Sequence, residues 1–296
     1  MNVRRPAKAD SAAVTGLIAA MTTHFAGEPE QTERDLLDEW DDLDLDCDAW
    51  LVELDQELAG YAALSTGAHT YIDVYVHPRC FARGVGSHLA ELAEREARRR
   101  GLERIQNAAL GNDERGRSLL ESRGYREVRR FRRMAVELGE PPPPAEWPPG
   151  LRAETLDYAR DADAFHVTLD EAFAEEFGHE PERGIDWRAR RERPGFDPTL
   201  WFVVKDADVV AAAALCRDDR FGGGWVASIG VLERYRRRGL GMALLQHCFS
   251  ELYRCGCRKI SLGVDAQNPT GATRLYERAG MHQVFEAVVY EKPLAL

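Results

Sequence analysis

Residues 236–241 read RRRGLG, between an apolar run, VASIGV at residues 226–231, and an amphipathic segment that reaches Cys255. This order predicts a strand, a glycine turn and a helix. Glycines allow close approach of the backbone to a ligand, and the free N–H groups at a helix start attract anions. Arginine adds forked donors that suit phosphate oxygens. The sequence therefore predicts an anion-binding cradle at this turn.

The same pattern occurs twice along the chain. Residues 83–105 align without a gap with residues 238–260, and residues 112–125 align with residues 268–281. A repeat of this length indicates two domains of one fold, because a solenoid has a far shorter period. A chain of 296 residues suits two domains that each bury a core of their own.

A proline-rich stretch separates the two repeats. Residues 140–150, EPPPPAEWPPG, hold six of the chain's 14 prolines. Proline runs favour extended backbone and cannot continue a helix or a central strand. We therefore predict an amino-terminal domain at residues 1–139, a linker at 140–150 and a carboxy-terminal domain at 151–296.

Composition narrows the functional classes. Hydrophobic residues at 44% and charged residues at 30% predict a soluble folded protein. A net charge of −11 argues against general nucleic-acid binding, and no apolar run approaches the ~20 residues of a membrane span. The six cysteines lack the paired spacing of zinc sites. We expect reduced thiols, no metal and a cytoplasmic location, and the oligomeric state stays open.

The coarse pattern alternates helices and strands in each half. Apolar residues recur at helical spacing over residues 160–177, as they do near the amino terminus. Strand-like runs are expected at residues 49–54, 59–64, 104–109, 132–137, 201–205, 208–215, 259–264 and 284–291. Early strands pair locally and later ones flank helices, so we predict an α/β (α+β) fold with a mixed, mostly antiparallel sheet and helices on both faces.

Two motifs in the second repeat resemble those of a known family. The turn Arg236-x-x-Gly239-x-Gly241 resembles the acetyl-CoA signature of the GCN5-related N-acetyltransferases (GNAT). Asn268 through Leu275-Tyr276-Glu277-x-x-Gly280-Met281 resembles the family's second motif, in the expected order. The tandem arrangement is similar to that of mycothiol synthase and other actinobacterial two-domain acetyltransferases. Counting the repeat, the resemblance covers nearly the whole chain.

The resemblance implies where acetyl-CoA, the co-substrate, would bind. In the family two strands splay apart after a bulge, and the pantetheine arm lies in the gap; here these strands would be residues 226–231 and 259–264. Backbone N–H groups at residues 237–242 would hold the pyrophosphate, and one near Val231 would polarise the acetyl carbonyl. The implied coenzyme-binding residues are Ile229, Gly230, Val231, Arg236, Arg237, Arg238, Gly239, Leu240, Gly241, Met242, Asn268 and Tyr276.

Tyr276 is the expected catalytic residue. In this family an amine attacks the thioester directly, so that a thiolate leaves. A thiol has a pKa near 8.5 and a phenol a pKa near 10, so tyrosine is protonated at neutral pH and suited to act as general acid. The other interpretation is that Tyr276 is a core aromatic of its helix.

The two repeats are unequal at two motif positions. Phe81 stands where the second repeat has Arg236, and Leu120 stands where it has Tyr276. The first repeat keeps Gly84, and backbone donors do not depend on side chains. We expect the second repeat to be catalytic. The first is then either a structural partner or a retained coenzyme-binding module.

The general base and the acceptor stay open. The strand at residues 226–231 has no carboxylate, so a water chain or a side chain elsewhere would take the proton. The candidate side chains are His166, Glu171, Glu175, Glu176, His179 and Asp265. We expect a primary amine of a small molecule or peptide as acceptor. The alternatives are the amine of a thiol sugar, as in mycothiol synthase, and a non-catalytic acyl-CoA-binding or regulatory protein.

Overall fold

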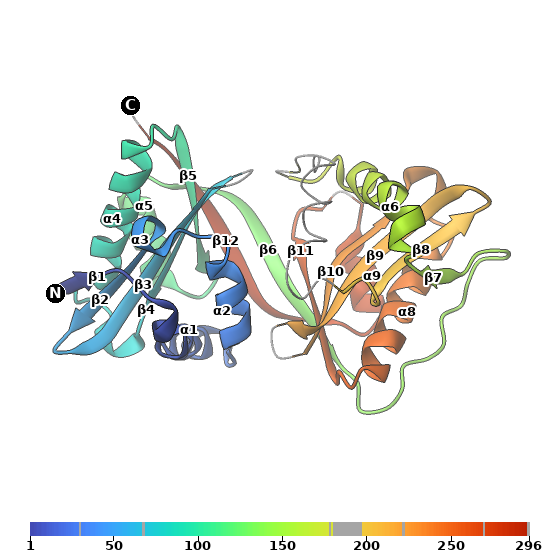
Figure 1. Ribbon diagram of the computed structural model, residues 1–296, viewed down its shortest axis with the longest axis horizontal. Coiled ribbons are helices and arrows are strands. Elements are labelled where there is room, and N and C mark those ends of the chain that lie inside the picture. The colour runs from blue at the N-terminus through green and yellow to red at the C-terminus, as the bar shows by residue number, and fades with distance from the viewer. Residues whose placement is uncertain are drawn as a thin grey trace. The chain divides into compact units, whose positions relative to one another are not determined.

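The computed structural model describes residues 1–29, 31–66, 69–177, 179, 197–220, 223–268 and 270–294. It has the predicted mixed α/β class, with strands and helices alternating along the chain (Figure 1). Two compact units are present. Unit 1 consists of Met1–Arg132 and Val284–Leu296, and unit 2 consists of Arg133–Gln283.

Unit 1 holds one sheet with the strand order β1-β2-β3-β4-β5-β12. All neighbouring pairs are antiparallel except β4 and β5, which are parallel. The strands are β1 (Asn2–Arg4), β2 (Ala49–Leu54), β3 (Glu57–Thr66), β4 (Thr70–Val76), β5 (Arg104–Leu110) and β12 (His282–Pro293). The helices are α1 (Ser11–Ala26), α2 (Glu33–Trp40), α3 (Leu45–Asp48), α4 (Val85–Arg99) and α5 (Glu114–Ser122).

The sheet of unit 1 is covered on both faces because its central strands are apolar on both sides. Successive side chains of a strand point to opposite faces. Val52 and Leu64 accordingly lie in one buried cluster with Leu89 of α4. Leu51 and Ala63 lie in a second cluster with residues of α1 and α2.

Unit 2 repeats this arrangement with the order β6-β11-β10-β9-β8-β7. Here β10 and β11 form the parallel pair. The strands are β6 (Arg126–Glu137), β7 (Ala153–Thr155), β8 (Trp201–Asp206), β9 (Val209–Arg220), β10 (Gly223–Val231) and β11 (Lys259–Asp265). The helices described in this unit are α6 (Tyr158–Phe173), α8 (Leu240–Arg254) and α9 (Ala272–Arg278).

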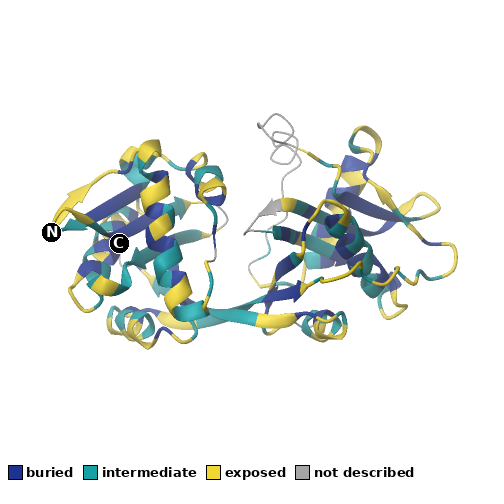
Figure 2. Ribbon diagram, turned by 90° about the horizontal axis from the view of Figure 1, so that it is seen from below, coloured by how far each residue is buried: buried dark blue, intermediate teal, exposed yellow. Residues whose placement is uncertain are grey.

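The two faces of this second sheet are also apolar. Val203 and Ala213 pack with Phe165 of α6, whereas Phe202 and Ala214 belong to the cluster that contains the buried face of α8. The alternation follows the period of two expected for strands that are buried on both sides. Figure 2 shows the resulting pattern, in which the central strands of each unit are buried and the outer helix surfaces are exposed.

The last strand of each repeat extends into the unit of the other repeat. β12 pairs antiparallel with β5 of unit 1, from Ala287↔Leu110 to Pro293↔Arg104 (Figure 1). β6 begins in unit 1, and its residues from Arg133 onward belong to unit 2. The strands expected at residues 132–137 and 284–291 therefore form, but each completes the sheet that the other repeat starts.

Two other segments bear on the expectations from sequence. α6 ends at Phe173, four residues before the predicted end, and Phe177 beyond it is 39% exposed. Residues 140–150, the predicted linker, contain no helix or strand. None of the helices in the described part of the chain combines the length and the apolar character that crossing a membrane requires.

Candidate functional site

The predicted glycine turn lies between β10 and α8 and has a left-handed backbone. Gly239 caps the start of α8 with a φ of 84°, and Arg237 has a φ of 61°. A Cβ atom on Gly239 would meet nothing within 4 Å. Glycine is therefore favoured at this position by the backbone conformation and not by crowding.

The elements around the turn pack closely at two other glycines. A Cβ atom on Gly230 of β10 would lie 2.7 Å from the Cβ of Ala172 in α6. A Cβ atom on Gly241 would lie 3.2 Å from Cδ1 of Leu275 in α9. Side chains at these positions would push α6 and α9 away from the strand end. These glycines thus hold both helices against the turn.

Arg236 makes contacts that the sequence did not suggest. Its Nε donates a hydrogen bond to the carbonyl of Val231 (3.0 Å), and its Nη2 donates to the carbonyl of Ala172 (3.1 Å). The guanidinium therefore ties the turn to the end of β10 and to the last turn of α6. Arg237 and Arg238, in contrast, are exposed and lie at the open side of the turn.

The gap expected between two central strands is present in unit 2. β10 and β11 pair only at Gly224↔Ile260 and Trp225↔Ser261. The register of β10 against β9 then shifts between Val226 and Ser228. Beyond this bulge, β10 continues to Val231 paired with β9 alone among the described strands. The sheet is therefore open next to the turn, and β10 also carries a bulge on the side of β9.

Unit 1 has the same splay without the bulge. β4 and β5 pair only at Tyr71↔Gln106 and Ile72↔Asn107, but β4 stays in regular register with β3 along its whole length. Its turn has the same backbone, with φ of 59° at Ala82 and 80° at Gly84. The bulge in β10 is thus a structural difference between the repeats that the motifs did not reveal.

In unit 1, Phe81 stands at the position of Arg236 and contacts a different helix. Phe81 stacks on Phe25 of α1, with ring centroids 5.7 Å apart and planes inclined by 26°. It therefore ties the turn of unit 1 to α1, much as Arg236 ties the turn of unit 2 to α6. The replacement keeps the anchoring and removes the charge.

Tyr276 lies on α9 with its ring in the core of unit 2 and 7% of the residue exposed. Burial raises the pKa of its hydroxyl, and the charges of Glu176 and Cys248 raise it further. The phenol is therefore protonated at neutral pH. No hydrogen bond joins this hydroxyl to another described residue. Leu120, at the matching position of unit 1, is a core residue with 5% exposure.

Asn268 follows β11 and contacts a carboxylate from the other side of the gap. Its Nδ2 donates to Oε1 of Glu176, which follows α6, at 2.8 Å. Burial raises the pKa of Glu176, the charge of Asp265 adds to this rise, and the Asn268 amide and Arg236 oppose it. Asn268 and Tyr276 are thus brought together around a carboxylate that sequence reasoning left among several candidates.

The other candidate bases have different surroundings. His166 is buried beside Trp201, with ring centroids 6.3 Å apart. Nε2 of His179 lies 3.7 Å from the carboxylate of Asp170. Asp265 accepts a hydrogen bond from the backbone N–H of Gln267 at 2.8 Å. Glu171 and Glu175 are exposed. Glu176 is partly buried, and its side chain accepts a hydrogen bond from the predicted site residue Asn268.

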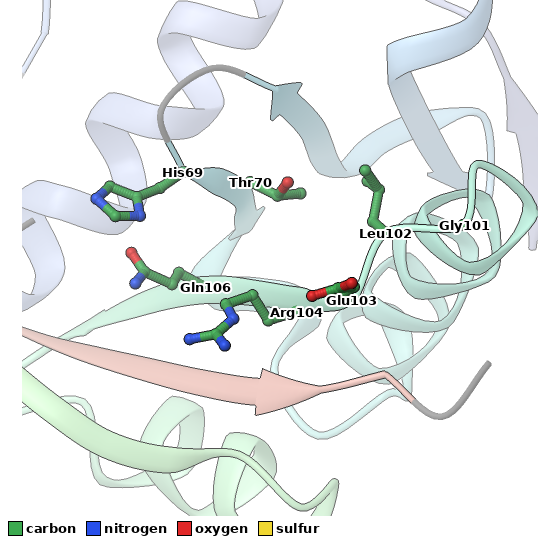
Figure 3. A pocket seen from close by; sticks show the side chains of 7 residues that line it. All are labelled: His69, Thr70, Gly101, Leu102, Glu103, Arg104 and Gln106. Atoms are coloured by element: carbon green, nitrogen blue, oxygen red, sulfur yellow. The ribbon is translucent and has the colours of Figure 1, made fainter. Parts of the chain in front are cut away.

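A cavity of about 300 Å³ lies elsewhere, in unit 1 (Figure 3). It is lined by His69, Thr70, Gly101, Leu102, Glu103, Arg104 and Gln106. These residues stand where β4 and β5 begin, at the opposite strand ends from the turn. The cavity is therefore separate from the site described above. All six cysteines are free thiols.

Comparisons with known proteins agree with this geometry. A family model described as the acetyltransferase (GNAT) family matches residues 17–125 and 162–281. The chain is similar to a mycothiol acetyltransferase of Geodermatophilus obscurus, with 30% identity over 294 residues that cover 94% of this chain and 93% of the relative. A mycothiol acetyltransferase of Cellulomonas flavigena is 30% identical over 258 residues, which cover 81% of this chain and 72% of the relative.

A solved structure shares the fold of the chain. The crystal structure of a GCN5-related N-acetyltransferase from Sphaerobacter thermophilus has a TM-score of 0.88 and 34% identity, covering 99% of this chain and 95% of that one. The family match occurs once in each repeat, so the resemblance inferred from the two motifs is confirmed. The chain belongs to the GNAT family of acetyltransferases and carries two copies of the domain in tandem.

Proposed function

We propose that this protein transfers an acetyl group from acetyl-CoA to a primary amine, and that unit 2 carries the reaction. The observation behind this proposal is that unit 2 alone joins three features at one place. These are the bulged strand β10, the left-handed turn at Gly239 and a buried tyrosine, Tyr276. Unit 1 keeps the turn, but has a regular β4 and a leucine in place of the tyrosine.

The geometry fits the coenzyme. A positive φ at Gly239 leaves the first N–H groups of α8 open to a pyrophosphate, and the exposed Arg237 and Arg238 add positive charge. Beyond Trp225, β10 has no pair with β11, and an extended pantetheine arm would be held along this free side, where Arg236 already occupies the Val231 carbonyl. Acetyl-CoA supplies an acetyl group activated as a thioester.

The side chains of unit 2 then divide the chemistry. A backbone N–H near Val231 would polarise the acetyl carbonyl, as an oxyanion-hole donor does. Tyr276 would give its phenolic proton to the departing sulfur. Because its pKa is raised, Tyr276 is protonated at neutral pH, so the proton is present when the carbon–sulfur bond breaks. Arg236 positions the turn through its two carbonyl contacts.

The relatives support a narrower choice of acceptor. Curated proteins that are about 30% identical over most of the chain are mycothiol acetyltransferases. The amine of a thiol sugar is therefore the second and narrower candidate, within the broader class of small-molecule primary amines. The two differ in specificity and not in the chemistry at Tyr276.

An amine panel tests the proposal. Purified protein is incubated with acetyl-CoA and amino sugars, polyamines, amino-acid amides or a cysteinyl amino sugar, and free coenzyme A is quantified by chromatography. Chromatography is preferred to a thiol reagent because one of the acceptors carries a thiol. Turnover of several amines supports the broad function, and turnover of the cysteinyl sugar alone supports the narrow one. Tight coenzyme binding without any turnover would contradict both.

A further inference from the structure

Glu176 stands where the three catalytic elements of unit 2 meet. Its carboxylate accepts a 2.8 Å hydrogen bond from Asn268, which follows β11. It is close enough to Tyr276 of α9 to raise that hydroxyl's pKa, and close enough to Arg236 of the turn for the guanidinium to act on its own pKa. The carboxylate is therefore held by the residue that follows β11, one of the two splayed strands.

We propose that Glu176 is the general base that takes a proton from the acceptor amine. This role rests on the proposed function of unit 2. Asn268 fixes one carboxylate oxygen, Oε1, and among the described residues no hydrogen bond to Oε2 is found, so we assign Oε2 as the proton acceptor. The strand before the turn offers no carboxylate here, since residues 226–231 read VASIGV. We therefore place the base on the segment that follows α6.

The proton balance is complete with residues of this chain. The acceptor enters as an ammonium ion, and Glu176 removes one proton and later releases it to water. The free amine forms a carbon–nitrogen bond with the acetyl carbon while the carbon–sulfur bond breaks. Tyr276 gives its proton to the sulfur, and the second proton of the nitrogen returns to the Tyr276 phenolate. The products are an amide, the free thiol and one proton in solution.

The matching contact in unit 1 has no such carboxylate. Asn112 aligns with Asn268, but its amide donates to the backbone carbonyl of Phe25 in α1. A carbonyl oxygen does not titrate near neutral pH, so this asparagine fixes the end of α1 without holding a base. The carboxylate contact is thus confined to the unit that also has the bulge and the tyrosine.

The charged and titratable groups around Glu176 set the pH at which it works. Asp265 faces it from the end of β11, Arg236 from the turn and Tyr276 from α9. On its own segment, the backbone N–H of His179 donates to the backbone carbonyl of Glu176 at 3.2 Å. Burial dominates, so its pKa lies above the ordinary value of a glutamate. A base with a raised pKa is better matched to an ammonium ion.

The test compares Glu176→Gln with Glu175→Gln, its exposed neighbour. For the amine that the wild type turns over fastest, kcat/KM is measured from pH 5 to pH 9. We expect Glu176→Gln to lower kcat/KM by roughly 10²- to 10⁴-fold and to remove the acid limb of the profile. The affinity for acetyl-CoA, measured by calorimetry, stays unchanged. Glu175→Gln keeps both the rate and the profile of the wild type.

A spectroscopic titration gives a readout that is independent of turnover. Carboxyl carbons of ¹³C-glutamate protein are followed against pH, and the signal missing in Glu176→Gln is assigned to Glu176. We expect it to titrate above the ~4.3 of an ordinary glutamate. An ordinary titration, or an unchanged kcat/KM in Glu176→Gln, would overturn the base while leaving acetyl transfer intact. Absence of wild-type turnover with every amine, despite coenzyme binding, would overturn the proposed function itself and the base with it.

Discussion

Ala82 and Arg237 occupy the same position in the two repeats and share a left-handed backbone, with φ of 59° and 61°. Each lies two residues before a glycine with a similarly positive φ, Gly84 or Gly239. The turn therefore keeps its shape whether or not an arginine is present. What separates the repeats is the set of side chains and strand irregularities around a common backbone.

This pair of turns allows a matched experiment on Gly239. Gly239→Ala and Gly84→Ala each force a side chain into positive φ, which costs about 1–2 kcal/mol of unfolding free energy. We expect both variants to lose this amount of unfolding free energy in urea denaturation. Crowding adds little to it, because a Cβ atom would meet nothing within 4 Å at Gly239 and only one side-chain atom, at 3.5 Å, at Gly84. Only Gly239→Ala should also lose acetyl transfer. An equal loss of turnover in Gly84→Ala would contradict the assignment of the reaction to unit 2.

Substitutions of the two arginines Arg236 and Arg238 are expected to affect different properties, stability and coenzyme binding. Arg236→Ala removes two hydrogen bonds to backbone carbonyls and should lower the unfolding free energy by about 1–3 kcal/mol. Arg238→Ala removes an exposed charge that lies 5.8 Å from the centroid of the Tyr235 ring, so it should lower stability by at most about 1 kcal/mol while weakening acetyl-CoA binding, most clearly at low salt. Urea denaturation and calorimetry measure the two effects. If Arg236→Ala were as stable as Arg238→Ala, that result would contradict the anchoring role of Arg236.

Replacing the hydroxyl of Tyr276 tests the acid. Tyr276→Phe keeps the buried ring and is expected to lower kcat by roughly 10- to 1,000-fold with little change in acetyl-CoA affinity. Tyr235→Phe is the control, because its hydroxyl donates to Asp206 at 3.0 Å and belongs to the support of the fold. That control should change stability without changing kcat. An unchanged kcat in Tyr276→Phe would show that Tyr276 is a core aromatic residue and not the general acid.

Acid stability should report on Asp161 at the start of α6. Arg160, together with Lys205, lowers the pKa of Asp161 to about 2 from its ordinary value of 3.8. A carboxyl with a lower pKa in the folded state stabilises the fold above its unfolded pKa, and this stabilisation is lost as pH falls from about 4 towards 2. We expect Asp161→Asn to be less stable at pH 7 and to show a shallower loss of unfolding free energy in that window. Parallel curves for both proteins would contradict this.

Much of this architecture was predictable from local patterns, and the exceptions have physical causes. The glycine turns followed from residue types, because a positive φ selects glycine at Gly84 and Gly239. The bulge at Ala227 did not, because any residue adopts that backbone and its effect depends on the neighbouring strand. Arg236 was expected beside a phosphate for its charge, but its partners are carbonyls that come together only after folding.

The contact between Asn268 and Glu176 was hidden for a similar reason. The two residues are 92 positions apart, and nothing in either local sequence points to the other. The last strands were found at their correct places, since apolar alternation marks a strand. Which sheet a strand joins depends on which neighbouring strand is available for pairing, and the sequence of β12 alone does not indicate that β5 is its partner.

The exchange of final strands has a consequence for synthesis on the ribosome. Unit 1 is made of Met1–Arg132 and Val284–Leu296, so its sheet lacks the strand beside β5 until the end of the chain emerges. During translation the edge of β5 stays available for pairing with foreign strands. The protein is therefore exposed to aggregation while only its amino-terminal half has been made. Unit 1 is synthesised first, but its sheet is completed only when β12 has been made.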